Sequence, residues 1–355
     1  MRVESAATVS LEDATITKSG DSTSSEDSDF YGLNAGVLAY DGSKLTVKGG
    51  SVSTDSQGSN GIFAYGEGTE VTVSGTKIAT TKDNSGGIEV SGGATLKATN
   101  LDVDTQGTSS AAIRSDRGGG TETVEGGTFT THGHNSPAVY STADVTVTGA
   151  TLLAEDSEGV VIEGKNSVTL KDTDLTGNVS GSTTRTGVSS NVMIYQSMSG
   201  DASEGTGSFA MEGGTFTAAN GTVFYVTNTD ATIDLTDVTF KQDADTLLTV
   251  AGNDGVWGNS GSNGGTVTLT ASKQELSGAI TVDEDSTLTL KLNDSSSYEG
   301  AINTDGQAGT VSVALESGST WTLTGDAYVT ELSGDTSGID LNGHTLYVNG
   351  VAWNG

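Results

Sequence analysis

The sequence predicts an all-β protein: a single-domain, right-handed parallel β-helix with three strands per coil and roughly a dozen coils. Two observations predict this fold class. An apolar triplet recurs along most of the 355-residue chain, and residues around it alternate between apolar and polar. The copies lie about two dozen residues apart, a period typical of a solenoid, whose coils bury their apolar faces only by stacking on one another.

The triplet has two apolar positions two residues apart and a third five residues later. Its copies are Val9/Leu11/Ile16, Leu45/Val47/Val52, Val71/Val73/Ile78, Leu96/Ala98/Val103, Val145/Val147/Leu152, Val168/Leu170/Leu175, Phe209/Met211/Phe216 and Ile233/Leu235/Phe240. One further copy, Glu122/Val124/Phe129, has a polar first member. The first two positions predict one strand of each coil and the third predicts the next strand, because a period of two places alternate residues on one face.

A third apolar run in each coil, often preceded by glycine, predicts the third strand. Examples are residues 36–39, 61–64, 87–90 and 159–162. Corners are expected where Gly, Asn, Asp and Ser gather, because these residues adopt left-handed backbone conformations most easily. The right-handed winding follows from the strong chirality of parallel crossover connections. No segment shows a sustained period of 3.6 residues.

We expect one continuous domain over the whole chain. Regular coils fill residues 1–266, with insertions near 18–33, 178–207 and 252–264, and tighter coils with a C-terminal cap fill 267–355. The first two insertions fall in the longest intervals between triplets. Long loops on a rigid solenoid are a common place for binding function, although solenoid corners also accept insertions at little cost.

The chain is strongly acidic, with 15 Lys and Arg against 46 Asp and Glu and a formal net charge of −31. This charge opposes binding to nucleic acid and to anionic membranes, and it keeps a long rod soluble as a monomer. The acidic residues are spread over the turns, which favours a solvated acidic surface. Weak calcium binding at the corners is the alternative, but no Asp-x-Asp-x-Asp-Gly loop is present, so we expect no cofactor.

The sequence contains no cysteine, so it predicts neither disulfides nor thiolate metal sites. No apolar run approaches the length that spans a membrane. The chain opens directly on a coil-like segment, with neither a signal peptide nor an anchor. We therefore expect the mature part of a secreted protein, from which the export signal has been removed.

The outward positions of the third strand are more apolar than a solvated sheet requires. We assign to this face Leu38, Phe63, Glu89, Ala112, Val139, Val161, Met193 and Phe224, with Tyr40, Tyr65, Arg114, Glu163 and Tyr195 beyond them. Exposed apolar patches usually mark a contact surface, and tyrosine suits stacking on carbohydrate. The candidate ligand contacts are Tyr40, Phe63, Tyr65, Met193, Tyr195, Phe224 and Trp257. The alternative is that the insertions pack over this face.

No catalytic residue is assigned. Glu89, Arg114, Asp116 and Glu163 are the best candidates for acid–base chemistry, but we place them several coils apart on the third strand. Cleavage of a polysaccharide needs such groups gathered on one outer face. If the protein were such an enzyme, its carboxylates would converge on one outer face. We expect a protein that is not an enzyme.

Two further motifs lead to weaker hypotheses. His132 and His134 form a His-x-His pair without the further ligands that zinc needs, so no metal site is expected. Threonines flank the inward residue of several second strands, at 15 and 17, 128 and 130, and 215 and 217. Flat Thr-x-Thr stacks form the surface of some ice-binding proteins. Here Lys77, Asp102 and Asp174 interrupt the stack, and threonine is also a common exposed strand residue.

The repeats VTVSGTKI (71–78) and VTVTGATL (145–152) resemble those of bacterial surface adhesins with pectate-lyase-like β-helices. The segments STWTLTGD (319–326) and IDLNGHTL (339–346) are similar to the end of autotransporter-type passenger domains. The resemblance spans nearly the whole chain. It implies a secreted or bacterial surface-displayed stalk or adhesin, and it carries over no catalytic or binding residue.

We therefore expect a non-enzymatic, adhesin-like protein that contacts a glycan or a host surface ligand. The first alternative is a polysaccharide lyase or glycoside hydrolase on the same scaffold. The others are a purely structural surface stalk and an ice-binding threonine array.

Overall fold

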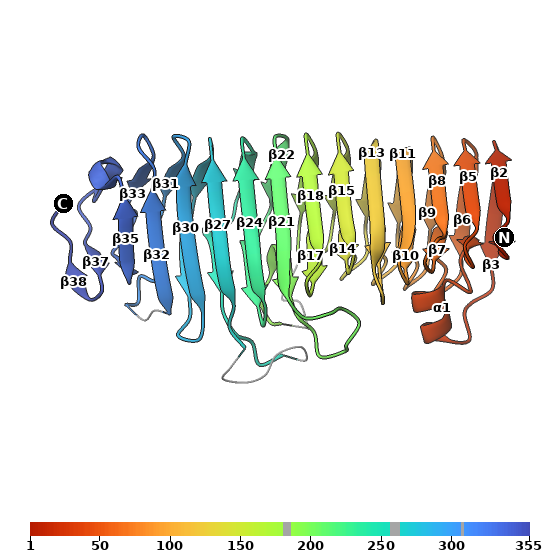
Figure 1. Ribbon diagram of the computed structural model, residues 1–355, viewed down its shortest axis with the longest axis horizontal. Coiled ribbons are helices and arrows are strands. Elements are labelled where there is room, and N and C mark those ends of the chain that lie inside the picture. Colours follow the sequence, from red (N-terminus) through yellow and green to blue (C-terminus); the bar gives the residue numbers. More distant parts are fainter. Residues whose placement is uncertain (180–185, 256–262, 307–308) are drawn as a thin grey trace.

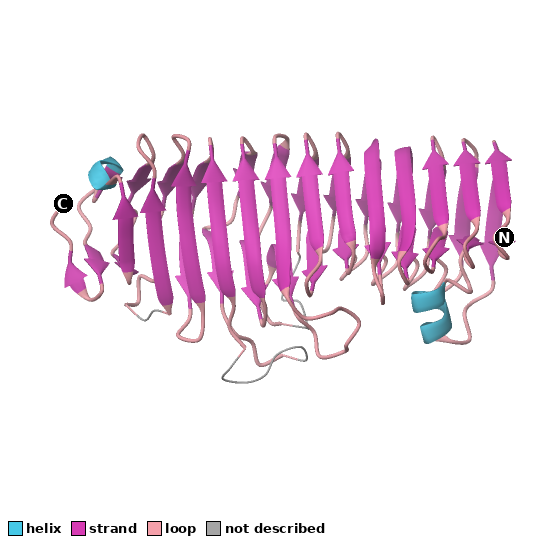
Figure 2. Cartoon of the chain, in the orientation of Figure 1, coloured by secondary structure: helices cyan, strands magenta, loops and turns pink. Residues whose placement is uncertain are grey.

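The computed structural model describes residues 1–179, 186–255, 263–306 and 309–355. The strands stack in parallel along one long axis, with the N-terminal coil at one end and the C-terminal strands at the other (Figures 1 and 2). This arrangement is a parallel β-helix, which confirms the predicted fold class.

The first strands of successive coils pair in parallel through the length of the molecule. They are β2 (Thr8–Glu12), β5 (Lys44–Lys48), β8 (Glu70–Ser74), β11 (Ala94–Thr105), β13 (Gly120–Thr131), β15 (Asp144–Thr148), β18 (Ser167–Lys171), β21 (Thr206–Glu212), β24 (Asp230–Thr236), β27 (Thr266–Ser272), β30 (Thr287–Asn293), β32 (Thr310–Leu315) and β35 (Glu331–Gly334). The first two triplet positions fall in register and face the core, as Leu45, Val71 and Leu96 illustrate.

The second strands form the next face of the coils. They are β3 (Thr15–Ser19), β6 (Ser51–Asp55), β9 (Lys77–Thr80), β16 (Thr151–Ala154), β19 (Asp174–Gly177), β22 (Thr215–Ala218) and β25 (Thr239–Gln242). In the coils of β11 and β13, one long strand covers both the first and the second face. The third triplet position also faces the core, because Ile78, Val103, Phe129 and Leu152 lie in register and are buried.

The third strands form an 11-stranded parallel sheet. They are β1 (Arg2–Val3), β4 (Val37–Ala39), β7 (Ile62–Tyr65), β10 (Ile88–Ser91), β12 (Ile113–Ser115), β14 (Val139–Ser141), β17 (Val160–Glu163), β20 (Ser190–Tyr195), β23 (Thr222–Thr227), β26 (Thr246–Val250) and β29 (Ala279–Val282). One outer column of this sheet runs through Leu38, Phe63, Glu89, Arg114, Tyr140, Val161, Met193 and Tyr225.

This register corrects the predicted outer face at three positions. Val139 and Phe224 lie in register with the inward residues Val160 and Val192, and Ala112 is likewise buried in the main core. The outward residues are Tyr140, Tyr225 and, two positions after Ala112, Arg114. At Phe224 the error arises because residues 223–226 are continuously apolar, so no polar residue marks which face points outward.

The first insertion contains a short helix, α1 (Ser25–Tyr31), that the sequence analysis did not predict. The side chain of Ser24 accepts a hydrogen bond from the Asp27 amide at the start of the helix, and Gly32 ends it in a left-handed conformation. Gly32 also packs against the ring of Phe63, where a Cβ atom would clash. The helix therefore lies against the outer face of the third sheet.

The C-terminal coils end in two small sheets. The strands β28 (Glu275–Ser277), β31 (Ser297–Glu299), β33 (Thr320–Thr322) and β36 (Ile339–Asp340) pair in parallel, beside β34 (Ala327–Val329), β37 (Leu346–Val348) and β38 (Val351–Ala352). A short 3-10 helix, η1 (Thr336–Gly338), precedes β36. Trp321 stacks on Tyr298 at 5.9 Å between ring centroids, and its indole N–H donates to the Gly300 carbonyl at 3.0 Å. The last pair, β37 and β38, is antiparallel.

Candidate functional site

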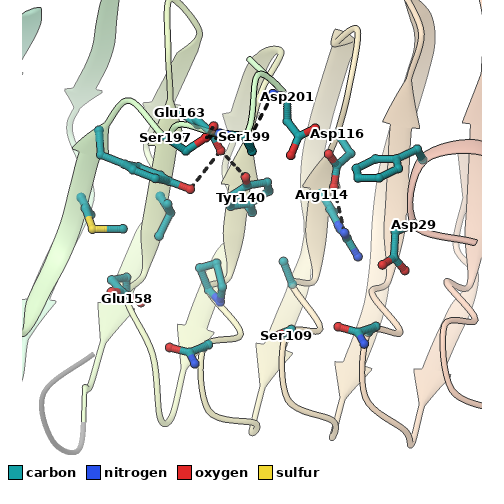
Figure 3. A pocket seen from close by; sticks show the side chains of 18 residues that line it. Asp29, Ser109, Arg114, Asp116, Tyr140, Glu158, Glu163, Ser197, Ser199 and Asp201 are labelled. Carbon is teal, nitrogen blue, oxygen red and sulfur yellow. Dashed lines mark hydrogen bonds and ion pairs between the residues drawn. The ribbon is translucent and has the colours of Figure 1, made fainter. Parts of the chain in front are cut away.

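A pocket of about 250 Å³ opens on the outer face of the 11-stranded sheet (Figure 3). Its floor comes from β12, β14, β17 and β20, which are consecutive in the sheet. One wall includes residues of α1, and another includes Ser197, Ser199 and Asp201, which follow β20. The predicted insertions at 18–33 and 178–207 therefore both contribute to one site.

Arg117 connects these two walls. Its guanidinium donates to Asp201 Oδ1 at 2.7 Å and 2.9 Å, and it lies 3.6 Å from a carboxylate oxygen of Glu26 in α1. The same guanidinium lies 3.8 Å from the centre of the Phe30 ring, within the range of a cation–π contact. Segments far apart in the sequence are thus held together above the sheet.

A buried carboxylate on β17 organises one side of the pocket. Glu163 is 1% exposed and accepts hydrogen bonds from Tyr140 Oη at 2.6 Å, from Tyr195 Oη at 2.9 Å and from Ser197 Oγ. Figure 3 shows Tyr140 and Ser197 close to Glu163. Burial, with the neighbouring Tyr195 and Glu163, raises the pKa of Tyr140 well above its ordinary value, so this hydroxyl remains a donor.

Arg114 lies among three carboxyl groups on the other side of the pocket. Its Nη2 donates to Asp116 Oδ2 at 2.8 Å, its Nε lies 3.6 Å from Glu89 Oε1, and in Figure 3 it points toward Asp29. Glu89 is fully buried, and burial raises its pKa well above the ordinary value, although Arg114 opposes the shift. Burial also raises the pKa of Asp29, again opposed by Arg114.

Four polar atoms of this group have no hydrogen-bond partner among the described residues. They are Nη1 of Arg114, Oδ1 of Asp29 and both carboxyl oxygens of Glu89, and all four are shielded from solvent. Of these residues, Arg114 and Asp29 line the pocket. A buried donor and a buried acceptor without partners cost free energy, which a ligand that supplies both functions would recover.

The candidate acid–base residues are closer together than predicted. Glu89 and Arg114 are direct neighbours in the register of β10 and β12, and Glu163 lies on β17, two strands beyond β12. The prediction that they lie several coils apart is therefore wrong for Glu89 and Arg114, but it holds for Glu89 and Glu163, which are three strands apart.

The predicted ligand contacts lie in different parts of the structure, and only some of them line the pocket. Met193 and Tyr195 line the pocket. Phe63 is fully buried with Leu38 and Ala35, and Tyr40 and Tyr65 pack around this cluster at half-buried positions. At these three residues the insertion packs over the outer face, which is the alternative to an exposed contact surface.

Phe224 points into the core, where its ring centroid lies 5.8 Å from those of Phe209 and Phe216. Its prediction as an outer-face contact is wrong for the reason of register given above. Trp257 lies outside the described residues.

Sequence reasoning missed Asp29, Tyr140, Ser197 and Asp201. Tyr140 could have been found by aligning the third strands on Arg114 and Val161, because the three residues share one column. The other three belong to insertions, where no periodic pattern indicates which side chains approach the sheet.

Two other motifs lie away from this pocket. The ring nitrogens of His132 contact Asp104 at 3.0 Å and Glu155 at 2.7 Å, and no group of three potential ligands in the described ranges could hold a metal ion. The threonine column of the second strands is interrupted in the structure, since Lys77 and Asp102 lie in register.

An elongated parallel β-helix with a walled pocket on one outer sheet is the class of protein that this fold and site define. Comparisons with models of protein families, with curated proteins and with solved structures return no match for this chain. Within the part of the chain that is described, no helix has the length and apolar character needed to cross a membrane.

Proposed function

We propose that the protein is a non-enzymatic, adhesin-like β-helix, secreted or displayed on a cell surface, that binds a glycan in the pocket between α1 and residues 196–205. The observation that carries this proposal is the pair of unpartnered atoms, Arg114 Nη1 and Asp29 Oδ1. Neighbouring groups on a sugar ring act as donors and acceptors, so one can accept from Arg114 while the next donates to Asp29.

The remaining lining suits the same class of ligand. Phe30, Tyr140 and Tyr195 offer ring surface beside polar groups, a combination that matches the apolar and hydroxylated faces of a sugar. The volume of about 250 Å³ is below that of pockets for drug-sized ligands, which begin at about 300 Å³. A single sugar unit of a longer glycan fits these dimensions better than a whole chain.

A glycan array followed by calorimetric titration tests this proposal. Asp29→Asn should weaken binding of the selected glycan by about 10- to 100-fold, because it replaces a hydrogen bond to a charged group with one to a neutral group. Asp27→Asn is the matched control, since it removes the same charge from an exposed position of the same helix. An array without binding, or equal affinities of the two variants, would contradict the proposal.

A glycoside hydrolase in the same pocket is the second candidate. It is favoured by the carboxyl groups of Asp29, Asp116, Glu163 and Asp201 around one cavity, and by the raised pKa of Asp29, which a general acid requires. The release of reducing ends from polysaccharides separates the two candidates. If the protein is a hydrolase, it should release reducing ends, and Asp29→Asn should abolish this release. If it is a binding protein, it should bind the glycan and release no reducing ends.

A further inference from the structure

We infer that the sugar bound in this pocket is an amino sugar with a free amine next to a hydroxyl group. The inference rests on the proposed function and specifies the class of glycan. It is based on the charge of the pocket lining and on the adjacent positions of Asp29 and Arg114.

The pocket lining is dominated by negative charge. Asp29, Asp116, Glu158, Glu163 and Asp201 line it, and the lining contains only one basic residue among the described positions, Arg114. An ammonium group is attracted by this surplus, whereas the carboxylate of a uronic acid is repelled. Both effects are stronger in a walled pocket than in open water, because the effective dielectric constant is lower there.

Most of these carboxylates already have partners. Arg114 binds Asp116, Arg117 binds Asp201, and Glu163 accepts hydrogen bonds from three hydroxyl groups. Glu158 accepts from Ser157 Oγ at 2.9 Å. Asp29 lines the pocket, and its Oδ1 remains without a hydrogen-bond partner among the described residues, so a cation that reaches this carboxylate meets an unsatisfied acceptor.

The position of Arg114 adds a requirement for a second group. Its Nη1 needs an acceptor, which an ammonium cannot provide because it only donates. An amine and a hydroxyl on adjacent ring carbons satisfy both atoms: the ammonium donates to Asp29, and the hydroxyl oxygen accepts from Arg114. N-acetylation would remove the charge and lengthen the substituent, and so would weaken the contact with Asp29.

Calorimetric titration with three probes at pH 6 and 0.15 M salt tests this inference. The probes are a glucosamine tetramer, its fully N-acetylated counterpart and a galacturonate tetramer. We expect one site per chain for the glucosamine tetramer, with an affinity at least about tenfold above that of the N-acetylated tetramer, and no binding of the galacturonate tetramer. Asp29→Asn should remove this preference, and Asp27→Asn should preserve it.

Each other outcome overturns the inference. Equal or tighter binding of the N-acetylated or galacturonate tetramer would exclude selection for an amine but would support the proposed glycan site. Equal losses in Asp29→Asn and Asp27→Asn would indicate diffuse attraction to an acidic rod. No binding of the glucosamine tetramer also rejects the inference, and the proposed function then depends on the glycan array. Thermal melting of both variants shows whether either substitution disturbs folding.

Discussion

Glu122 places a carboxyl group inside the apolar column. It lies in register with Leu96 and Val145, is fully buried, and neither carboxyl oxygen has a hydrogen-bond partner among the described residues. Burial, together with the charge of Glu89, raises the pKa of Glu122 well above its ordinary value. The polar member of the ninth triplet is therefore a local cost to stability.

This cost depends on pH. Below the pKa of the unfolded chain, about 4.3 for glutamate, both states are protonated and ionisation imposes no penalty. As the pH rises above that value, the unfolded state ionises first, so stability falls until the pKa of the folded state is reached. Glu122 therefore destabilises the folded state least at acidic pH.

Glu122→Leu should raise the free energy of unfolding at pH 7 by about 1–3 kcal/mol, because it removes a buried group without a partner. It should also flatten the dependence of stability on pH above about 4.3. Thermal unfolding between pH 4 and 8 measures both effects. Glu125→Leu, at an exposed position of the same strand, is the control. Parallel pH profiles for wild type and Glu122→Leu would refute this account.

His132 links three successive coils. It lies just after β13, between Asp104 of β11 and Glu155, which follows β16. Burial lowers the pKa of His132, but the two carboxylates outweigh this effect and raise it above 6.5. The stabilisation from the protonated ring is therefore complete below the pKa of the unfolded chain and is lost as the pH rises through the folded pKa.

His132→Gln should lower the midpoint of thermal unfolding at pH 5.5 and have a smaller effect at pH 8.5, because the ring loses its charge as the pH rises. His344→Gln is the control, since His344 forms no ion pair within the described ranges. If His132→Gln lowers the midpoint equally at both pH values, the ring acts through packing or neutral hydrogen bonds instead of charge.

A ladder of buried serines supports one corner of four consecutive coils. The amide N–H groups of Ser59, Ser85 and Ser110 donate to the Oγ atoms of Ser85, Ser110 and Ser136, at 2.9–3.0 Å. Serine is predicted at corners from its backbone preferences. The ladder itself could not be predicted, because its hydrogen bonds depend on the stacking of coils.

At the scale of the whole molecule, the periodic part of the fold could be predicted and the site only in part. The triplets identified the inward residues because alternation with polar residues marks each face. Alternation fails where a run is continuously apolar, as at Phe224, and there the assigned register shifted by one residue. The pocket also depends on the contact of Arg117 with Asp201, 84 residues later, which no local pattern encodes.

The central claim is that the two insertions enclose the ligand site on the third sheet. Hydrogen exchange of the intact chain, with and without a glycan selected on the array, tests it most directly. We predict slower exchange on binding, concentrated in residues 25–33, 113–117, 160–163 and 190–201. Protection elsewhere on the rod, with these segments unchanged, would contradict the claim.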